Sequence, residues 1–285
     1  MDRRMHTNEI TPRRGFFTRI AASAMVIGLT GLGSAPARAA AGAEDGPGGP
    51  DDWIKNVKGT HRCLFDFPQH KNGLPLLHIL NYLNTYSEAY KTTPGQVGAV
   101  GTFYGIGGQS SIPLAFNDAM WAKYDLGAYT GLKDGSGKPH TRNVLNKPTP
   151  ADLNLLMEVF QSPPIPMLAG VLPALGIESL QKMGTTFLLC ANALGGWCAE
   201  LEARGNGKMA DIQAELKANM LPGVTIVPAM VIAIEAAQGA GIAYNRQSRL
   251  PPAPLTADKL LDQLAELTLA ASQALELDAL FFGQL

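Results

Sequence analysis

The sequence has little cysteine: Cys63, Cys190 and Cys198 are the only three in 285 residues. A small scaffold stapled by disulfides needs a denser and even set, so we expect stability to come from a packed core. At least one thiol stays unpaired unless it bridges two chains. The five histidines show no ligand pair at helical spacing, and we therefore expect no metal site.

Long apolar runs are also missing. The uncharged run Ile20 to Pro36 is rich in Gly, Ala, Ser and Thr, which favours an export signal over its alternative, a membrane anchor. Before this run, Thr11-Pro12-Arg13-Arg14-Gly15-Phe16-Phe17 resembles the twin-arginine motif, and after it Ala37-Arg38-Ala39 fits the small-x-small cleavage rule. We predict that residues 1–39 are a twin-arginine signal peptide cleaved near Ala39. The twin-arginine translocase is then a partner during export, and the mature protein is periplasmic.

Basic charge becomes scarce once this leader is removed. Residues 1–39 hold six of the 23 Lys and Arg residues and two of the 24 Asp and Glu residues. The remainder therefore has 17 basic and 22 acidic residues, a net charge of −5. An acidic chain offers no broad basic surface, which argues against nucleic-acid binding. No later stretch is apolar enough to span a bilayer, so we expect no membrane association after cleavage.

The remaining chain alternates between two patterns. Apolar, β-branched runs predict strands at 61–67, 96–104, 185–189, 224–227 and 242–244, and helical spacing predicts helices at 74–91, 111–124, 191–204 and 229–238. Strands that are apolar throughout and separated by helices form parallel sheets covered on both faces. The predicted class is therefore a three-layer α/β domain with a mostly parallel sheet.

Four segments complete the predicted organisation. Residues 40–52 resemble a disordered spacer, and the α/β domain spans 53–246. Within it, residues 127–172 interrupt the rhythm with many Gly, Pro, Asn and Lys residues, which predicts a long insertion that serves binding or contacts another subunit. Residues 247–285 are a linker and an amphipathic helix.

Cys190 is the first candidate for chemistry. It directly follows the strand predicted at 185–189 and precedes the helix predicted from Ala191, at the sheet edge where parallel α/β domains bind ligands. The positive end of the helix dipole at this position favours the nucleophilic thiolate. A buried structural cysteine is the alternative interpretation.

A glycine-rich turn is the second candidate. Gly105, Gly107, Gly108 and Ser110 follow one predicted strand and precede a predicted helix, so their backbone N–H groups could cradle an anion. The spacing is neither that of a P-loop nor that of a dinucleotide fingerprint. A tight turn with a serine cap is the favoured alternative, and we expect no cofactor.

Several stretches together carry a family resemblance: 186–205, 221–228, 238–241, 116–127 and Arg142-Asn143. Over residues 57–245 they resemble an exported branch of the DsrE/DsrF-like superfamily. The resemblance implies a flavodoxin-like α/β/α domain that assembles as a homo-oligomer, a trimer or a hexamer. In the sulfur-relay members one cysteine carries sulfur as a persulfide, and Cys190 is the residue that would inherit this role. The chain departs from the branch at Tyr104-Gly105, where His-Gly is expected.

Two functions compete on this sequence. The first is a periplasmic sulfur-handling protein, a sulfur carrier or sulfurtransferase, in which Cys190 bears a transient persulfide. The second is a non-catalytic module that binds a small ligand or partner through the 127–172 insertion and an oligomer interface, with Cys190 dispensable. A nucleotide- or flavin-binding enzyme ranks third, because the Gly105 turn lacks a fingerprint.

Overall fold

A computed structural model describes residues 49–247. Its strands are β1 (His61–Asp66), β2 (Val97–Phe103), β3 (Thr185–Cys190), β4 (Val224–Val227) and β5 (Ala243–Arg246). The α-helices are α2 (Leu74–Ala89), α3 (Asp118–Lys123), α4 (Leu126–Thr130), α5 (Asn154–Phe160), α6 (Pro166–Ala169), α7 (Leu172–Leu175), α8 (Ile177–Lys182), α9 (Ala191–Ala203), α10 (Met209–Ala218) and α11 (Met230–Gly239). The 3₁₀ helices are η1 (Asp52–Asn56), η2 (Lys71–Gly73), η3 (Ile112–Ala115) and η4 (Pro150–Asp152).

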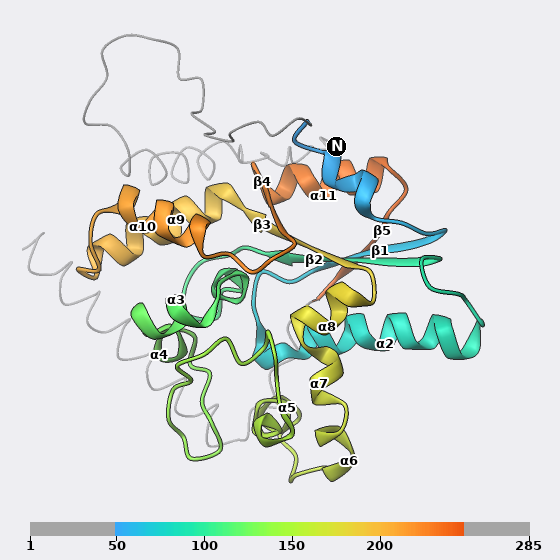
Figure 1. Cartoon of the computed structure of the whole chain (residues 1–285), viewed down its shortest axis with the longest axis horizontal. Helices are drawn as coiled ribbons and strands as arrows, with labels where there is room; N and C mark the ends of the chain where they lie inside the picture. Colours follow the sequence, from blue (N-terminus) through green and yellow to red (C-terminus); the bar gives the residue numbers. More distant parts are fainter. Residues whose placement is uncertain (1–48, 248–285) are drawn as a thin grey trace, which may run out of the picture. The chain divides into compact units, whose positions relative to one another are not determined.

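The strands form one sheet in the order β4-β3-β2-β1-β5, and every pairing is parallel. The chain steps across the sheet from β1 to β4 and then returns to pair β5 with β1 on the other side. Helices lie on both faces, with α2, α7 and α8 on one face and α11 on the other (Figure 1). The domain therefore has the predicted three-layer, flavodoxin-like α/β/α architecture.

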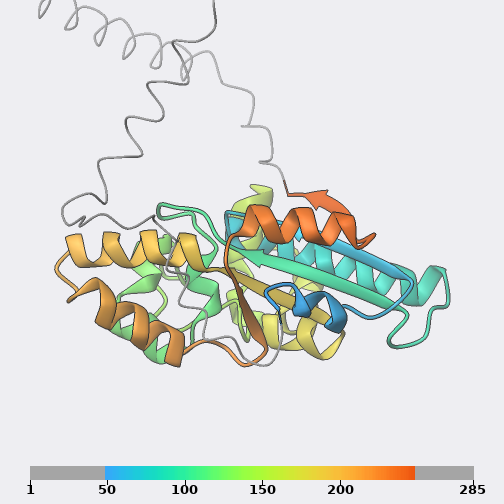
Figure 2. The ribbon, with the colours of Figure 1, turned by 90° about the horizontal axis from the view of Figure 1, so that it is seen from above.

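Two hydrophobic cores cover the two faces of the sheet. The larger core contains alternate strand residues such as Phe65, Phe103 and Phe187 together with buried residues of α2, α9 and α10. The smaller core contains the intervening strand residues, including Leu64 and Leu188, with residues of η1 and α11. Figure 2 shows α11 lying over the sheet on this second face. The connections from β1 to β4 run across the sheet in one direction, and the connection from β4 back to β5 runs in the other. Its helix, α11, lies on the opposite face, so all the crossover connections have the same handedness.

The strand and helix predictions are confirmed with two exceptions. The single helix expected at 111–124 is wrong, because the chain forms η3 and α3 with a break at Phe116 and Asn117. There the Asn117 side chain accepts a hydrogen bond from the Met120 N–H and begins a new helix. Helix α10, between α9 and β4, was not predicted.

The 127–172 segment has more structure than its composition suggests. It contains most of α4, all of η4, α5 and α6, and the first residue of α7, and it buries Leu132, Val144 and Leu155 in the larger core. The interrupted rhythm reflects helices of four to seven residues, which are too short to show a helical period.

The leader at 1–39 and the C-terminal helix predicted within 247–285 lie outside the described residues, as does most of the 40–52 spacer. Among the helices between residues 49 and 247, none has both the length and the apolar character needed to cross a membrane.

Candidate thiol site at the carboxyl edge of the sheet

The connections that follow β3 and β4 leave the sheet on opposite faces. Helix α9 packs Leu194 and Trp197 into the larger core, whereas α11 packs Met230 and Ala233 into the smaller one. Such a reversal is the topological switch point at which open α/β sheets form a ligand crevice beyond the carboxyl ends of their strands. The switch point of this domain therefore lies between β3 and β4.

Cys190 is located at this point. It is the last residue of β3 and pairs with Val227, the last residue of β4. Its Sγ accepts hydrogen bonds from the backbone N–H of Ala193 in α9, at 3.4 Å, and from that of Met230 in α11, at 3.3 Å. The thiol therefore accepts backbone N–H groups from the N-terminal turns of two helices at once.

Access to the thiol is restricted. Cys190 is 5% exposed and belongs to the smaller core. The Asn192 N–H donates to the Pro228 carbonyl at 3.3 Å, which ties the start of α9 to the loop before α11. The thiol therefore presents little of its surface to solvent.

The structure places a polar cluster on the same face that the sequence did not reveal. Tyr104 packs against the smaller core and follows Phe103, the partner of Leu189, so it lies beside Cys190 at the sheet edge. The Tyr104 hydroxyl donates to Asp66 Oδ1 at 2.7 Å, and the Tyr244 hydroxyl donates to Asp66 Oδ2 at 2.6 Å.

This buried carboxylate holds two phenols in their neutral form. Asp66 is 5% exposed, and both of its oxygens accept a phenolic hydrogen bond. Burial and the neighbouring Asp66 raise the pKa of Tyr104, and the Asp66 hydrogen bond, followed by burial, raises that of Tyr244. The available signal in the sequence was an acid at the last position of an apolar strand, where ligand-binding side chains are common. In the sequence Tyr104 stands out only as a departure from the resemblance, which expects histidine there.

The glycine-rich turn forms a tight turn. Gly105 and Gly107 have φ of +100° and +80°, and a Cβ on Gly105 would lie 2.4 Å from the Pro68 carbonyl oxygen. The Ser110 hydroxyl is buried and bonds to the carbonyls of Tyr104 and Gly105. Gly108 is equally close to the backbone, because a Cβ on it would lie 2.7 Å from the Tyr129 carbonyl oxygen.

The segment after the turn differs from the predicted helix. The turn leads into η3, a four-residue 3₁₀ helix, and the α-helix expected from residue 111 is not formed. The backbone N–H groups of the turn are therefore followed by a short 3₁₀ helix in place of the α-helix N-terminus that was expected there.

The other two cysteines are buried in the larger core. Cys63 is 7% exposed and Cys198 is fully buried, both in the larger core, so the sheet separates Cys63 from Cys190. Burial raises the pKa of each thiol to about 11. All three cysteines are free. Within residues 49–247 no group of three His, Cys, Asp or Glu side chains is arranged to hold a metal ion.

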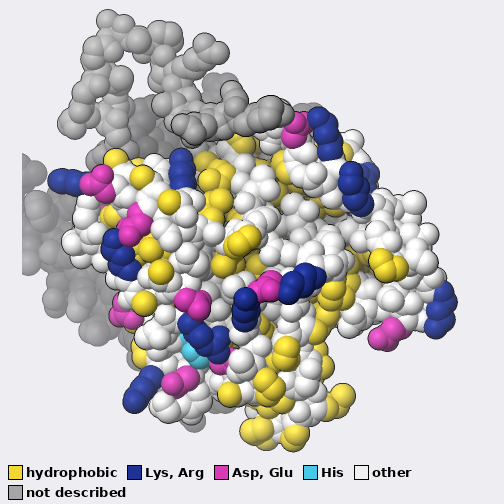
Figure 3. Space-filling model, in the orientation of Figure 1, with side chains coloured by type: hydrophobic (Ala, Val, Ile, Leu, Met, Phe, Trp, Pro, Cys, Tyr) yellow, Lys and Arg dark blue, Asp and Glu magenta, His cyan; other side chains and the backbone are white. Residues whose placement is uncertain are grey.

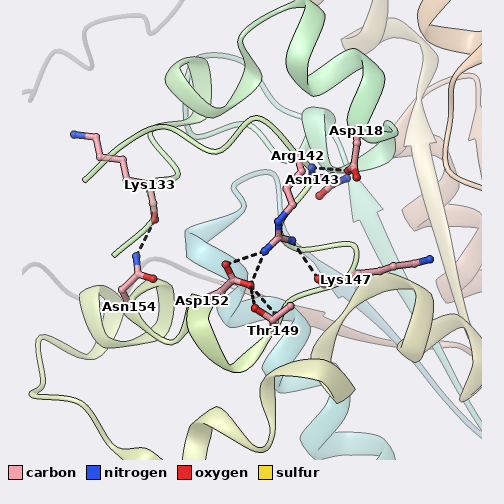
Figure 4. Close-up of polar contacts among 8 residues, drawn as sticks. All are labelled: Asp118, Lys133, Arg142, Asn143, Lys147, Thr149, Asp152 and Asn154. Carbon is pink, nitrogen blue, oxygen red and sulfur yellow. Dashed lines mark hydrogen bonds and ion pairs between the residues drawn. The ribbon is translucent and has the colours of Figure 1, made fainter. Parts of the chain in front are cut away.

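A polar network supports the insertion. Arg142 donates to both oxygens of Asp152, at 2.9 and 2.7 Å, and the same carboxylate accepts from the N–H and hydroxyl of Thr149 (Figure 4). The neighbouring Asn143 N–H donates to Asp118 Oδ1 at 2.9 Å. Residues 118 and 142–143, which carry part of the family resemblance, therefore meet in a structural role.

The insertion also carries an apolar groove. It has a volume of about 460 Å³, and its lining includes Leu153, Met157 and Pro164. Beside it Ile165 and Met167 are 36% and 77% exposed. Figure 3 shows apolar side chains gathered at the end of the molecule where Figure 1 places α5 and α6.

Comparisons of the chain with protein-family models, curated proteins and solved structures found no match. The functional assignment therefore depends on the geometry of the site and on the resemblance in the sequence.

Proposed function

We propose that this chain is a periplasmic sulfur-handling protein in which the Cys190 thiolate accepts and passes on sulfane sulfur. The observation that carries the proposal is the position of Sγ at the topological switch point, where it receives N–H groups from two helices. The same residue is the one that the DsrE/DsrF-like resemblance selects. A sulfur carrier needs a stabilised thiolate and a donor, and it needs no metal.

The step is a nucleophilic displacement at sulfur. With thiosulfate as donor, the Cys190 thiolate attacks the outer sulfur and a new S–S bond forms. The S–S bond of thiosulfate breaks, and sulfite leaves with its electron pair. The product is a Cys190 persulfide anion, so charge and electrons balance without an external oxidant.

The negative charge stays within reach of the same donors throughout this step. It begins on Sγ and ends on the outer sulfur, one bond further from the strand end. The two helix N-termini that face Sγ favour anions near them. Burial shields the persulfide from water and bulk oxidants, and it restricts the donor to a small molecule such as thiosulfate.

Location and assembly are part of the proposal. The twin-arginine leader supports export to the periplasm, and the apolar tip of the insertion, with Met167 at 77% exposure, supports contact between copies in a homo-oligomer. The mass of the mature protein by light scattering tests the trimer or hexamer. A monomer that persists at high protein concentration would refute the oligomer.

Intact-mass spectrometry of the mature protein tests the sulfur chemistry. The protein is incubated with thiosulfate, trapped with iodoacetamide and mapped by peptide digestion. We expect a gain of one sulfur at Cys190 that dithiothreitol removes, and none in Cys190→Ser. Cys63→Ala is the matched control, because it removes a thiol from the other face of the sheet and should load like the parent protein. A folded protein that gains no sulfur at Cys190 refutes the proposal.

The insertion groove favours a second candidate function, a binding module for a small apolar ligand. The groove lies among Leu153, Met157 and Pro164, and it is lined mainly by carbon atoms. Under this hypothesis Cys190→Ser leaves binding intact, whereas Met157→Glu abolishes it. Binding of a small environment-sensitive fluorophore to the two variants separates the candidates.

A further inference from the structure

An open groove runs between α2 and the edge strand β5. Its volume is about 480 Å³, and its lining includes His78, Asn81, Tyr82, Tyr86, Tyr90 and Asn245. This volume is within the range of about 300–1,000 Å³ that is typical of small-ligand sites. The Phe65 side chain, which belongs to the larger core, closes the floor of the groove.

Three tyrosines form a continuous aromatic ladder along α2. Tyr82 and Tyr86 have ring centroids 5.0 Å apart, and Tyr86 and Tyr90 have centroids 5.1 Å apart. Their spacing of four residues places them on one side of the helix. His61, at the start of β1, stacks on Tyr86 at 4.5 Å and supports that ring. The rings are therefore held by one another, while Tyr90 remains 69% exposed.

Hydrogen-bonding groups border the ladder. Asn81 lies one turn before Thr85 on α2, and Asn245 extends from β5 on the opposite wall. The Asn245 Oδ1 accepts from Gln247 Nε2 at 3.0 Å, which orients its amide nitrogen. Asn81 Oδ1 accepts only a long hydrogen bond, of 3.5 Å, from the Thr85 hydroxyl. Both amides therefore keep donor or acceptor capacity for a ligand.

The lining contains no Asp, Glu, Lys or Arg among the residues that the structure describes. A charged peptide or a nucleic acid would find no counter-charge in this groove. Exposed aromatic faces combined with side-chain amides suit a neutral ring that has C–H groups on its faces and hydroxyls at its edge. We propose that the groove between α2 and β5 is a binding site for a neutral saccharide.

This site is separate from the thiol. Tyr82 and Phe65 pack on the face of the sheet that carries α2, whereas Cys190 faces the smaller core beneath α11. Saccharide binding therefore does not depend on the proposed sulfur chemistry, and either proposal can fail without the other.

Saturation-transfer NMR with the neutral sugars maltotriose, cellotriose and fully N-acetylated chitotriose tests the site on the full mature chain. We expect at least one of the three to receive saturation. Tyr90→Ala should weaken the Kd of that sugar by about 2- to 10-fold, the loss expected for one aromatic contact. Asn81→Ala should weaken it as well, and Phe160→Ala, an exposed aromatic residue on the insertion, should leave it unchanged.

Because Tyr90 is mostly exposed, its removal should not unfold the protein, and circular dichroism checks this. Absence of saturation transfer to all three sugars overturns the proposal. So does a Kd that is the same in the parent protein, Tyr90→Ala and Asn81→Ala.

Discussion

Replacing Cys190 tests whether its sulfur holds the two helix N-termini as the structure describes. Cys190→Ala removes the acceptor for the N–H groups of Ala193 and Met230, and burial prevents water from replacing it easily. Cys190→Ser keeps an acceptor at a helix N-cap, where serine is a preferred residue. The two variants lose the same thiol but differ in hydrogen bonding.

The magnitude follows from the two lost hydrogen bonds. Each contributes about 0.5–1.5 kcal/mol, so Cys190→Ala should lower the free energy of unfolding by about 2 kcal/mol. For a domain of this size that corresponds to a fall in Tm of about 4–8 °C. Cys190→Ser should lose less than half of this, about 1 kcal/mol or below.

Urea unfolding followed by tryptophan fluorescence measures both variants against the parent protein. The slope of the transition should stay constant, because the area exposed on unfolding is unchanged. If Cys190→Ala is as stable as Cys190→Ser, the sulfur does not satisfy these N–H groups and the capping argument is wrong. Sulfur loading should be absent in both variants whatever their stability.

Three further predictions concern residues outside the thiol site. The Cys198 thiol, whose pKa burial raises to about 11, should resist iodoacetamide at pH 8 and react only after unfolding in urea, as mass spectrometry would record. Burial lowers the pKa of His70 from 6.5 to about 4. The neutral ring therefore contributes its full stability above pH 6.5, and the free energy of unfolding should fall by about 3 kcal/mol as the pH drops to about 4. His70→Gln should flatten this dependence in urea unfolding at several pH values. Asp152→Asn weakens the bidentate contact with Arg142 and should cost about 2 kcal/mol, against less than about 0.5 kcal/mol for Lys182→Met at an exposed pair.

Each of these predictions has a clear contrary result. Labelling of native Cys198 at the rate of an unfolded thiol would show that the larger core is open. An unchanged acid dependence in His70→Gln would assign that dependence to other groups. Equal losses in Asp152→Asn and Lys182→Met would mean that the insertion network adds no more than a surface ion pair does.

Burial is what lowers the pKa of His70, and the hydrogen bonds of the ring fix the tautomer of its neutral form. Its Nδ1 accepts from the Asn72 N–H at 3.1 Å, and its Nε2 lies 3.2 Å from the Thr130 carbonyl, to which it donates. Protonation would place a hydrogen on Nδ1, facing another donor. The sequence showed an isolated histidine with no ligand partner and could not show this arrangement.

The sequence by itself determined the class of the fold, because strand and helix periods are local properties of consecutive residues. The strands at 185–189 and 224–227 and the helix at 191–204 were predictable for this reason. So was the position of Cys190 between a strand and a helix. The short helices of the insertion and the break at Asn117 were not, because they depend on caps and on packing against distant segments.

Only the tertiary structure decided what surrounds Cys190. That β4 lies beside β3, and that α11 leaves on the opposite face, is a matter of strand order, which no local pattern specifies. The second N–H donor comes from Met230, 40 residues away, and Asp66 meets Tyr244 across 178 residues. Contacts between residues so far apart in the sequence form only when the sheet assembles. The order of the strands in turn depends on how the helices are distributed over the two faces of the sheet.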